Sequence, residues 1–307
     1  MADTIPVVDL REFLDPTRRD AFVRALGEGL ERFGFVAVTG HGISETLLAR
    51  AYDVAGDVFA LPASVKARYE IPSNGRQRGY TSLGVEHAKD HLVPDLKEFW
   101  HIGRNLSPDH PLAISGDVPA NHHPEELPAF TDVFDALFAQ MEDFANRLLV
   151  AVAAYLGQRE DYFREMVADG NSVLRVIHYP PVGEDIPMGA VRAAAHEDIN
   201  LLTVLPVATA PGLELLTRHG VWMPVHTPPD VMVCDTGDMM ARLTGGRLPA
   251  TTHRVVNPEL DRSARLSMPF FLHPHPDHLL QPLFGEPTPP IRAREFLLER
   301  LRAIGVA

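Results

Sequence analysis

Residues 173–179 read Val173-Leu-Arg-Val-Ile-His-Tyr179, and they are the first of seven short β-type runs in the second half of the chain. The other six runs, each bounded by turn residues, lie at 200–205, 213–216, 221–225, 231–235, 251–256 and 265–272. Many short strands with frequent turns are typical of an antiparallel sandwich or barrel. This part of the sequence therefore predicts a core of the jelly-roll type.

Helical spacing of apolar residues predominates on both sides of this β-rich part. It predicts helices at 15–34, 44–62, 124–157 and 291–304. A short strand is expected at 35–38, and the Gly-, Pro- and His-rich stretch 72–121 is expected to be loop with at most one strand. The fold class is thus α+β with a mainly β core, an N-terminal helical domain, a long central helix and a C-terminal helix.

The length of 307 residues is large for one simple domain and small for two independent ones. We therefore expect one large core with helical additions. Its expected parts are an N-terminal domain at 1–120, a central helical segment at 121–170, a β-rich core at 171–276 and a C-terminal helix packing on that core at 277–307.

Charge and cysteine content narrow the classes of partner and site. The 28 Lys and Arg residues against 41 Asp and Glu residues leave a net charge of −13, which argues against a nucleic-acid partner. Cys234 is the single cysteine, so an internal disulfide and a cysteine-cage metal site are excluded. No apolar run reaches the length of a membrane span, and residues 1–6 carry an acid where a secretory signal would carry positive charge, so we expect no secretory signal. We expect a cytoplasmic protein with no membrane partner, as a monomer or weak homo-oligomer.

Histidine is the unusual feature of the composition, with 15 copies, and three of them precede an acidic residue by two positions. The three pairs are His123/Glu125, His196/Asp198 and His275/Asp277. In an extended segment, residues i and i+2 point to the same side and can meet one metal ion. The first pair opens the long helix, where the helix dipole explains the glutamate, and the third lies beyond the last strand. We interpret both of these as surface features.

His196 and Asp198 stand immediately before an apolar strand, and His253 follows in another β-type run 55 residues after Asp198. Two imidazoles and one carboxylate on adjacent strands form the facial triad of non-haem Fe(II) sites. A zinc hydrolase could use similar donors, so the triad alone does not define the reaction.

Arg265-Leu-Ser267 begins the last β-type run, twelve residues after His253. In a strand Arg265 and Ser267 face the same way, so a guanidinium and a hydroxyl could together bind one carboxylate inside the barrel. Alternatively, Arg265 could be a solvated charge at the end of a strand. Its spacing from the triad makes this second interpretation the weaker one.

Further motifs accompany these residues along the chain. In order, the set is Ile5-Pro-Val-Val-Asp-Leu10, Gly34-Phe-Val-Ala-Val38, Gly40-His-Gly42, Gly79-Tyr80, Asp95-Leu-Lys-Glu-Phe99, Tyr179-Pro-Pro181, His196-Glu-Asp198, Thr244-Gly-Gly-Arg247, His253-Arg-Val255 and Arg265-Leu-Ser267. From residue 5 to about 275 the chain thus resembles the isopenicillin N synthase-like iron(II)/2-oxoglutarate-dependent dioxygenases.

The resemblance implies a double-stranded β-helix core and a set of site residues. His196, Asp198 and His253 would hold Fe(II), while Arg265 and Ser267 would hold the distal carboxylate of 2-oxoglutarate. The hydroxyl of Tyr179 would contact the same carboxylate. One departure is Ile177, where many plant members have an asparagine near the cosubstrate. Ile177 cannot donate that hydrogen bond, so we expect the orientation or affinity of the cosubstrate to differ.

The implied activity is oxidation of a small-molecule metabolite by hydroxylation, desaturation or cyclisation. It would consume O2 and 2-oxoglutarate and release succinate and CO2, with ascorbate as a candidate stimulant. One alternative is an oxidase of the same fold that does not consume 2-oxoglutarate. Another is a non-catalytic metal-binding or ligand-sensing barrel. A zinc hydrolase is disfavoured because no acid beyond Asp198 is evidently placed as a base.

The substrate cavity is expected to be lined by segments outside the iron and cosubstrate motifs. These segments are 76–80, 95–104 and the strand that begins at Asn200. The candidate anchors for a substrate carboxylate are Arg76, Arg78, Arg104 and Arg192. For each of them, a solvated surface position is an equally good interpretation.

Overall fold

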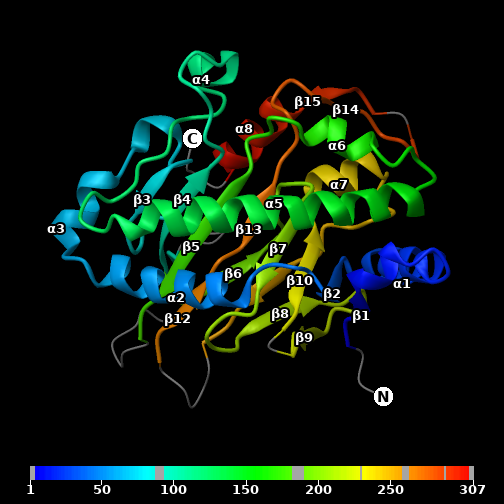
Figure 1. The fold of residues 1–307 in the computed structure, drawn as a ribbon, viewed down its shortest axis with the longest axis horizontal. Helices are drawn as coiled ribbons and strands as arrows, with labels where there is room; N and C mark the ends of the chain where they lie inside the picture. Colours follow the sequence, from blue (N-terminus) through cyan, green and yellow to red (C-terminus); the bar gives the residue numbers. More distant parts are fainter. Residues whose placement is uncertain are drawn as a thin grey trace.

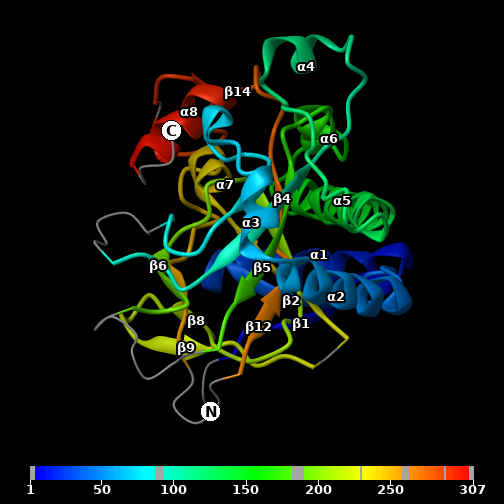
Figure 2. The same cartoon turned by 90° about the vertical axis from the view of Figure 1, so that its left-hand side faces the viewer.

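The computed structural model describes residues 4–86, 93–181, 190–228, 230–257, 263–286 and 288–303. A large sheet runs through the middle of the molecule, with helices on one side and a smaller sheet on the other (Figure 1). The view turned by 90° shows the three layers side by side (Figure 2). This arrangement agrees with the predicted jelly-roll core and its helical additions.

The large sheet has nine strands. In spatial order they are β1 (Val7–Asp9), β2 (Phe35–Thr39), β10 (Met232–Thr236), β7 (Leu202–Pro206), β13 (Phe270–Leu272), β5 (Val173–Tyr179), β4 (Glu98–Gly103) and β3 (Gly79–Thr81), and β12 (Arg265–Ser267) also pairs with β5. The pairing of β1 with β2 is parallel, and the other pairings in this sheet are antiparallel.

The small sheet has four strands and faces the large one. Its order is β6 (Ala193–His196), β11 (His253–Val255), β8 (Leu213–Leu216) and β9 (Trp222–Pro224). A separate hairpin-like pair consists of β14 (Leu279–Leu280) and β15 (Ile291–Arg292).

Three long helices cover the outer face of the large sheet (Figure 2), and shorter ones lie around its ends. The long helices are α1 (Arg19–Phe33), α2 (Glu45–Ala60) and α5 (Ala129–Tyr155). The others are α3 (Ala63–Lys66), α4 (Pro111–Ser115), α6 (Tyr162–Val167), α7 (Asp238–Leu243) and α8 (Ala293–Ala303). In the described ranges, no helix is both long and apolar enough to cross a membrane.

Local sequence explains where the first two long helices end and begin. Gly34 follows α1 in the left-handed conformation, with φ of 67°, which glycine adopts at little cost. A Cβ atom at this position would lie 2.9 Å from the carbonyl oxygen of Pro249 and 2.2 Å from Oγ1 of Thr251, so the chain approaches closely here. Ser44 caps α2 because its side chain accepts a hydrogen bond from the backbone N–H of Leu47.

The long helix α5 has the apolar stripe that the sequence predicts. Its buried residues include Phe134, Met141 and Leu148, and Phe138 packs edge-on against Phe270 of the large sheet with ring centroids 5.0 Å apart. The helix begins at Ala129, after Pro128, rather than at Pro124.

The stretch 72–121 contains more regular structure than predicted. Besides the short helix α4 it contributes two strands, and all six residues of β4 are buried against β5. Glu98 in this strand accepts hydrogen bonds from Lys66 and His178. The strand is difficult to predict because its one charged residue, Glu98, is neutralised by partners that are distant in the sequence.

Two strands also differ from the prediction. The run 265–272 is divided into β12 and β13 at Met268 and Pro269, because proline has no N–H for the ladder. The strand β6, which ends at His196, consists mainly of alanines and was not predicted.

Candidate metal centre

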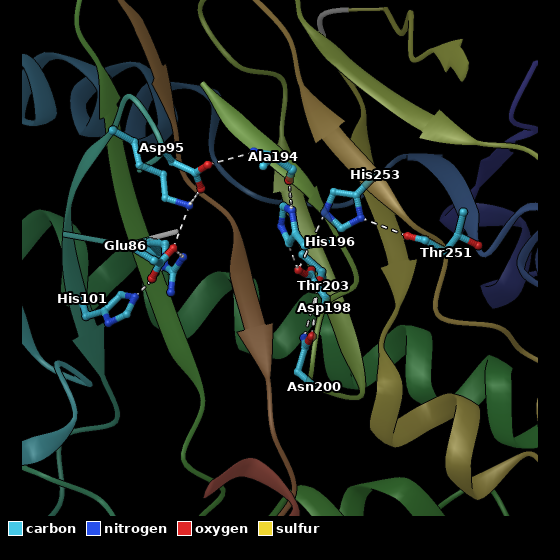
Figure 3. A network of polar contacts seen from close by, with 12 residues as sticks. Glu86, Asp95, His101, Ala194, His196, Asp198, Asn200, Thr203, Thr251 and His253 are labelled. Carbon is cyan, nitrogen blue, oxygen red and sulfur yellow. Dashed lines mark hydrogen bonds and ion pairs between the residues drawn. The ribbon is translucent and has the colours of Figure 1, made fainter. Parts of the chain in front are cut away.

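The structure brings the three predicted metal ligands together between the two sheets. His196 is the last residue of β6, His253 is the first residue of β11, and the two are register partners. Asp198 follows β6 by two residues. One donor atom from each of the three lies within 4.8 Å of the others, and in the described part of the chain this is the single such group. Figure 3 shows the three side chains converging.

The hydrogen bonds of the two imidazoles orient their free nitrogens. Nδ1 of His196 lies 2.7 Å from the carbonyl oxygen of Ala194, and Nδ1 of His253 lies 3.1 Å from that of Thr251. A carbonyl can only accept, so each Nδ1 carries the hydrogen and each Nε2 keeps its lone pair. These Nε2 atoms lie 3.9 and 3.8 Å from Oδ1 of Asp198. Both imidazoles therefore present a metal-binding nitrogen to one point.

Electrostatics also favour this arrangement. Burial, with a contribution from His253, lowers the pKa of His196 to about 4, so the ring is neutral at physiological pH. A neutral imidazole is the form that binds a metal ion. The site therefore has the donor set and the protonation state that Fe(II) requires.

The carboxylate of Asp198 is held by two polar neighbours. The hydroxyl of Thr203 donates a hydrogen bond to its Oδ2. Asp235, on the neighbouring strand β10, has a pKa raised well above its usual range by burial and by the charge of Asp198. A protonated Asp235 can donate to Asp198. This residue was not predicted to belong to the site, although an acid at the end of the apolar run 231–234 was a usable signal.

The predicted cosubstrate residues lie together on β12 and β5. Arg265 is the register partner of Tyr179, and its Cζ atom lies 5.0 Å from the centroid of that ring. Ser267 is the register partner of Ile177. Ile177 belongs to a buried apolar cluster with Phe99 and other residues, so packing replaces the hydrogen bond that an asparagine could make.

The guanidinium of Arg265 lacks one partner. Its Nε donates to the carbonyl oxygen of Ala210 at 2.9 Å, but its buried Nη1 finds no acceptor among the described residues. A buried cation with an unsatisfied donor is unfavourable unless an anion compensates it. The position therefore fits the carboxylate of a bound dicarboxylic acid.

A cavity of about 550 Å³ adjoins two of the three ligands, His196 and Asp198. His196, Asp198 and Asn200 line one side, and Asp95, Lys97, His101 and Arg175 line another. The C-terminal helix α8 contributes Leu297, Arg300 and Leu301. Each of the three predicted wall segments thus supplies at least one lining residue, with Gln77 coming from 76–80, while β5, β13 and α8 add residues that were not predicted.

The four arginines proposed as anchors do not line this cavity. Arg76 pairs with Glu70, Arg104 pairs with Glu142, Nη2 of Arg78 donates to Asn171, and Nη2 of Arg192 donates to the carbonyl of Ser263. The lining arginines are Arg175 and Arg300. Arg175 is an arginine between apolar residues of β5, which was the available signal.

The other two His/acid pairs have no third ligand beside them in the part of the chain that the structure describes. His123 is not at the surface as predicted, because its side chain is 15% exposed and its Nδ1 lies 2.9 Å from Oγ1 of Thr131. His275 accepts a hydrogen bond from the backbone N–H of Asp277, a local turn contact.

Comparisons with known proteins agree with this geometry. Residues 5–126 match the family model for the N-terminal part of non-haem dioxygenases in morphine synthesis, and residues 170–274 match the model for the 2OG-Fe(II) oxygenase superfamily. The chain is 30% identical over 292 residues to the 2-oxoglutarate-Fe(II) type oxidoreductase hxnY of Emericella nidulans, covering 91% of this chain and 82% of that one.

Two solved structures are also similar over nearly the whole length. One, from Caulobacter crescentus, is described as a 2OG-Fe(II) oxygenase family protein, with 38% identity, a TM-score of 0.88, and coverage of 99% of this chain and 100% of that one. The other is a full-length Neurospora crassa protein in complex with alpha-KG, with 25% identity, a TM-score of 0.86, and coverage of 97% and 95%. The chain therefore belongs to the 2OG-Fe(II) oxygenase superfamily, whose members use Fe(II), 2-oxoglutarate and O2.

Proposed function

We propose that this dioxygenase oxidises a small-molecule metabolite by hydroxylation, desaturation or cyclisation and releases succinate and CO2. The observation that carries the proposal is the meeting of three metal-binding donors within 4.8 Å beside a cavity. In addition, the buried Arg265 keeps an unsatisfied donor that a cosubstrate carboxylate would complete.

His196, Asp198 and His253 are the proposed iron ligands. When bound, iron and 2-oxoglutarate supply the oxidising chemistry with O2. The backbone carbonyls of Ala194 and Thr251 hold the two imidazole rings, and these contacts keep both Nε2 lone pairs directed at the site. Three protein ligands leave the remaining coordination positions open for small molecules.

Arg265, Ser267 and Tyr179 are the proposed cosubstrate residues. The planar guanidinium suits a bidentate contact with a carboxylate, and its burial excludes competing water. Because position 177 is isoleucine rather than asparagine, its side chain cannot add a hydrogen bond from β5 to the cosubstrate. We therefore expect Arg265 to contribute a large share of the cosubstrate's affinity.

A free small molecule as the substrate is supported by the cavity volume and by the names of relatives. A relative from Petromyces alliaceus is named proline hydroxylase, one from Glycine max is named homoarginine-6-hydroxylase, and a further structure of the Neurospora crassa protein contains thymine. The net charge of −13 disfavours nucleic acid. A cytoplasmic location, a monomeric or weakly associated state and stimulation by ascorbate are parts of the proposal.

The division of the chain at 1–120, 121–170, 171–276 and 277–307 is proposed as well. The ranges of the two family models, 5–126 and 170–274, support the first and third parts.

A metabolite panel tests the proposal directly. The protein is incubated with Fe(II), 2-oxoglutarate, O2 and ascorbate, and succinate release is compared with and without each compound. Substrate-stimulated succinate is the expected result. Oxidation of a compound without succinate would instead identify an oxidase of the same fold, and stimulation only by a protein or nucleic acid would contradict the small-molecule proposal.

A further inference from the structure

The wall of the cavity opposite the metal ligands contains a compact set of buried charges. Lys97 places its Nζ 2.7 Å from Oε1 of Glu86 and 2.8 Å from Oδ2 of Asp95. Arg175 places its Nη1 3.1 Å from the same Oε1 of Glu86, and its Nε donates to Nε2 of His101 at 2.6 Å. These five residues all line the cavity. We name them the charged wall; Figure 3 shows its position beside the metal ligands.

The charged wall carries no net charge. Its two carboxylates balance its two cations, and burial together with Arg175 keeps the pKa of His101 well below its usual range, so that ring is neutral. The pKa of Glu86 is also held well below its usual range, because Arg175 and Lys97 outweigh the effect of burial. Arg300, which lines the cavity from α8, is likewise paired with Asp238 at 2.7 Å. An anionic substrate would therefore lose its hydration without meeting an unpaired cation.

Arg175 nevertheless keeps hydrogen-bonding capacity toward the cavity. Its two side-chain hydrogen bonds use Nε and Nη1, and no acceptor among the described residues takes a hydrogen from Nη2. The guanidinium lies 4.4 Å from the ring centroid of Phe99 and 5.4 Å from that of Phe271, which holds its plane in place. Its side chain is 20% exposed although it lies inside the protein, so an edge of it remains open to the cavity.

Another part of the cavity wall is apolar. Val173 and Phe271 line it from β5 and β13, and Leu297 and Leu301 line it from α8. A volume of about 550 Å³ is within the range of cavities that hold small organic ligands. A ligand with one polar end and an apolar body could place the polar end against Arg175 and the body against these apolar residues.

Building on the proposed function, we propose that Arg175 anchors the carbonyl oxygen of a neutral substrate, such as an amide or lactam with an apolar body, and that Glu86 makes the site discriminate against carboxylates. Glu86 cancels the charge of Arg175 but leaves its Nη2 hydrogens free. The guanidinium then acts as a hydrogen-bond donor rather than as a counter-ion.

Isosteric pairs of probes test this inference. Phenylacetamide is compared with phenylacetate, and cyclohexanecarboxamide with cyclohexanecarboxylate. Binding is measured without O2 on the protein loaded with Fe(II) and 2-oxoglutarate, through the change each probe causes in the charge-transfer absorption of that complex. We expect each amide to bind more tightly than its acid. If neither amide binds, or if the acids bind more tightly, the inference is wrong.

Three variants test which residues cause the preference for amides over acids. Arg175→Gln should weaken amide binding by about tenfold, since it removes one hydrogen bond to the ligand. Glu86→Gln keeps an acceptor for Lys97 but leaves the charged wall with one net positive charge, so acid binding should gain about tenfold. Arg104→Gln, which alters a half-buried Arg–Glu pair outside the cavity, is the matched control and should change neither.

The outcomes separate this inference from the proposed function. If the wild-type protein shows no charge-transfer absorption with Fe(II) and 2-oxoglutarate, the proposed function fails. If the absorption is present in all variants but Arg175→Gln and Glu86→Gln leave the amide and acid affinities unchanged, only the inference about Arg175 fails.

Discussion

His253 lies directly opposite His196 across the ladder between β6 and β11, with the centroids of the two imidazole rings 4.4 Å apart. Backbone hydrogen bonds between the two strands thus set the separation of two proposed metal ligands. The third, Asp198, lies in the connection from β6 to β7, where its carbonyl oxygen accepts a hydrogen bond from the backbone N–H of Asp238 and its carboxylate accepts one from Thr203.

Replacing Asp198 with alanine should abolish tight Fe(II) binding while the protein stays folded. The variant lacks one of the three metal ligands, whereas the stability of the fold comes from apolar packing elsewhere. Iron content after desalting and a thermal unfolding curve measure the two effects. His196→Ala and His253→Ala should behave alike, and His275→Ala is the matched control. Full iron occupancy in the Asp198→Ala protein would contradict the assignment.

Thr203→Val should weaken iron binding by about 10- to 100-fold, the usual effect of removing a group that orients a metal ligand. The valine has the shape of threonine but cannot donate to Oδ2 of Asp198. Competition with a chelator gives the affinity, and Thr203→Ser should restore most of it. Equal affinities of the valine variant and the wild type would show that Thr203 does not position Asp198.

Arg265→Ala should reduce the affinity for 2-oxoglutarate by about two to four orders of magnitude, because breaking a buried charge pair costs about 3–5 kcal/mol. Arg265→Lys should also bind poorly, since an ammonium cannot form the bidentate contact. Calorimetric titration of the Fe(II)-loaded protein measures both. Arg254→Lys, in the neighbouring small sheet, should leave the affinity unchanged. Unaltered binding to Arg265→Ala would place the carboxylate elsewhere.

The metal-free protein should lose stability as the pH falls from 7 to 5, in part through His273. Burial lowers the pKa of this residue to about 4, so the folded state resists a proton that the unfolded state accepts below about 6.5. Its contribution is present at pH 7 and decreases by about 2 kcal/mol at pH 5. Urea unfolding at the two pH values checks this. His273→Gln should reduce the pH dependence by that amount, and His275→Gln serves as the control.

Gly34→Ala should destabilise the fold by about 2 kcal/mol or more, because alanine is strained at φ of 67° and its Cβ would meet the carbonyl of Pro249. The clash also displaces Thr251, whose carbonyl oxygen holds the ring of His253, so iron affinity should fall as well. Gly56→Ala in α2, where no atom lies within 4 Å of the added Cβ, should instead add up to about 1 kcal/mol of stability. Comparable losses in both variants would contradict the special role of Gly34.

Local rules account for what the sequence predicted well. Apolar spacing located α1, α2, α5 and α8, and the alternation of short runs and turns located most of the β core. His196 and Asp198 could be paired because residues two apart in an extended chain share a side. The same two-residue alternation predicted that Arg265 and Ser267 share a side of their strand. Helical spacing and strand alternation involve residues only a few positions apart, so they can be recognised in a single sequence.

Only the tertiary structure decided which charged residues face the cavity. Nothing in the local sequence separates Arg175, which lines it, from Arg104, which pairs with Glu142 outside it. The strand β4 and the buried Asp235, whose pKa is raised by burial and by Asp198, could not be recognised from the sequence for the same reason. The state of a buried charge is set by partners that lie up to about a hundred positions away, as with Glu86 and Arg175. Electrostatic energy depends on distance in space, which the order of residues along the chain does not specify.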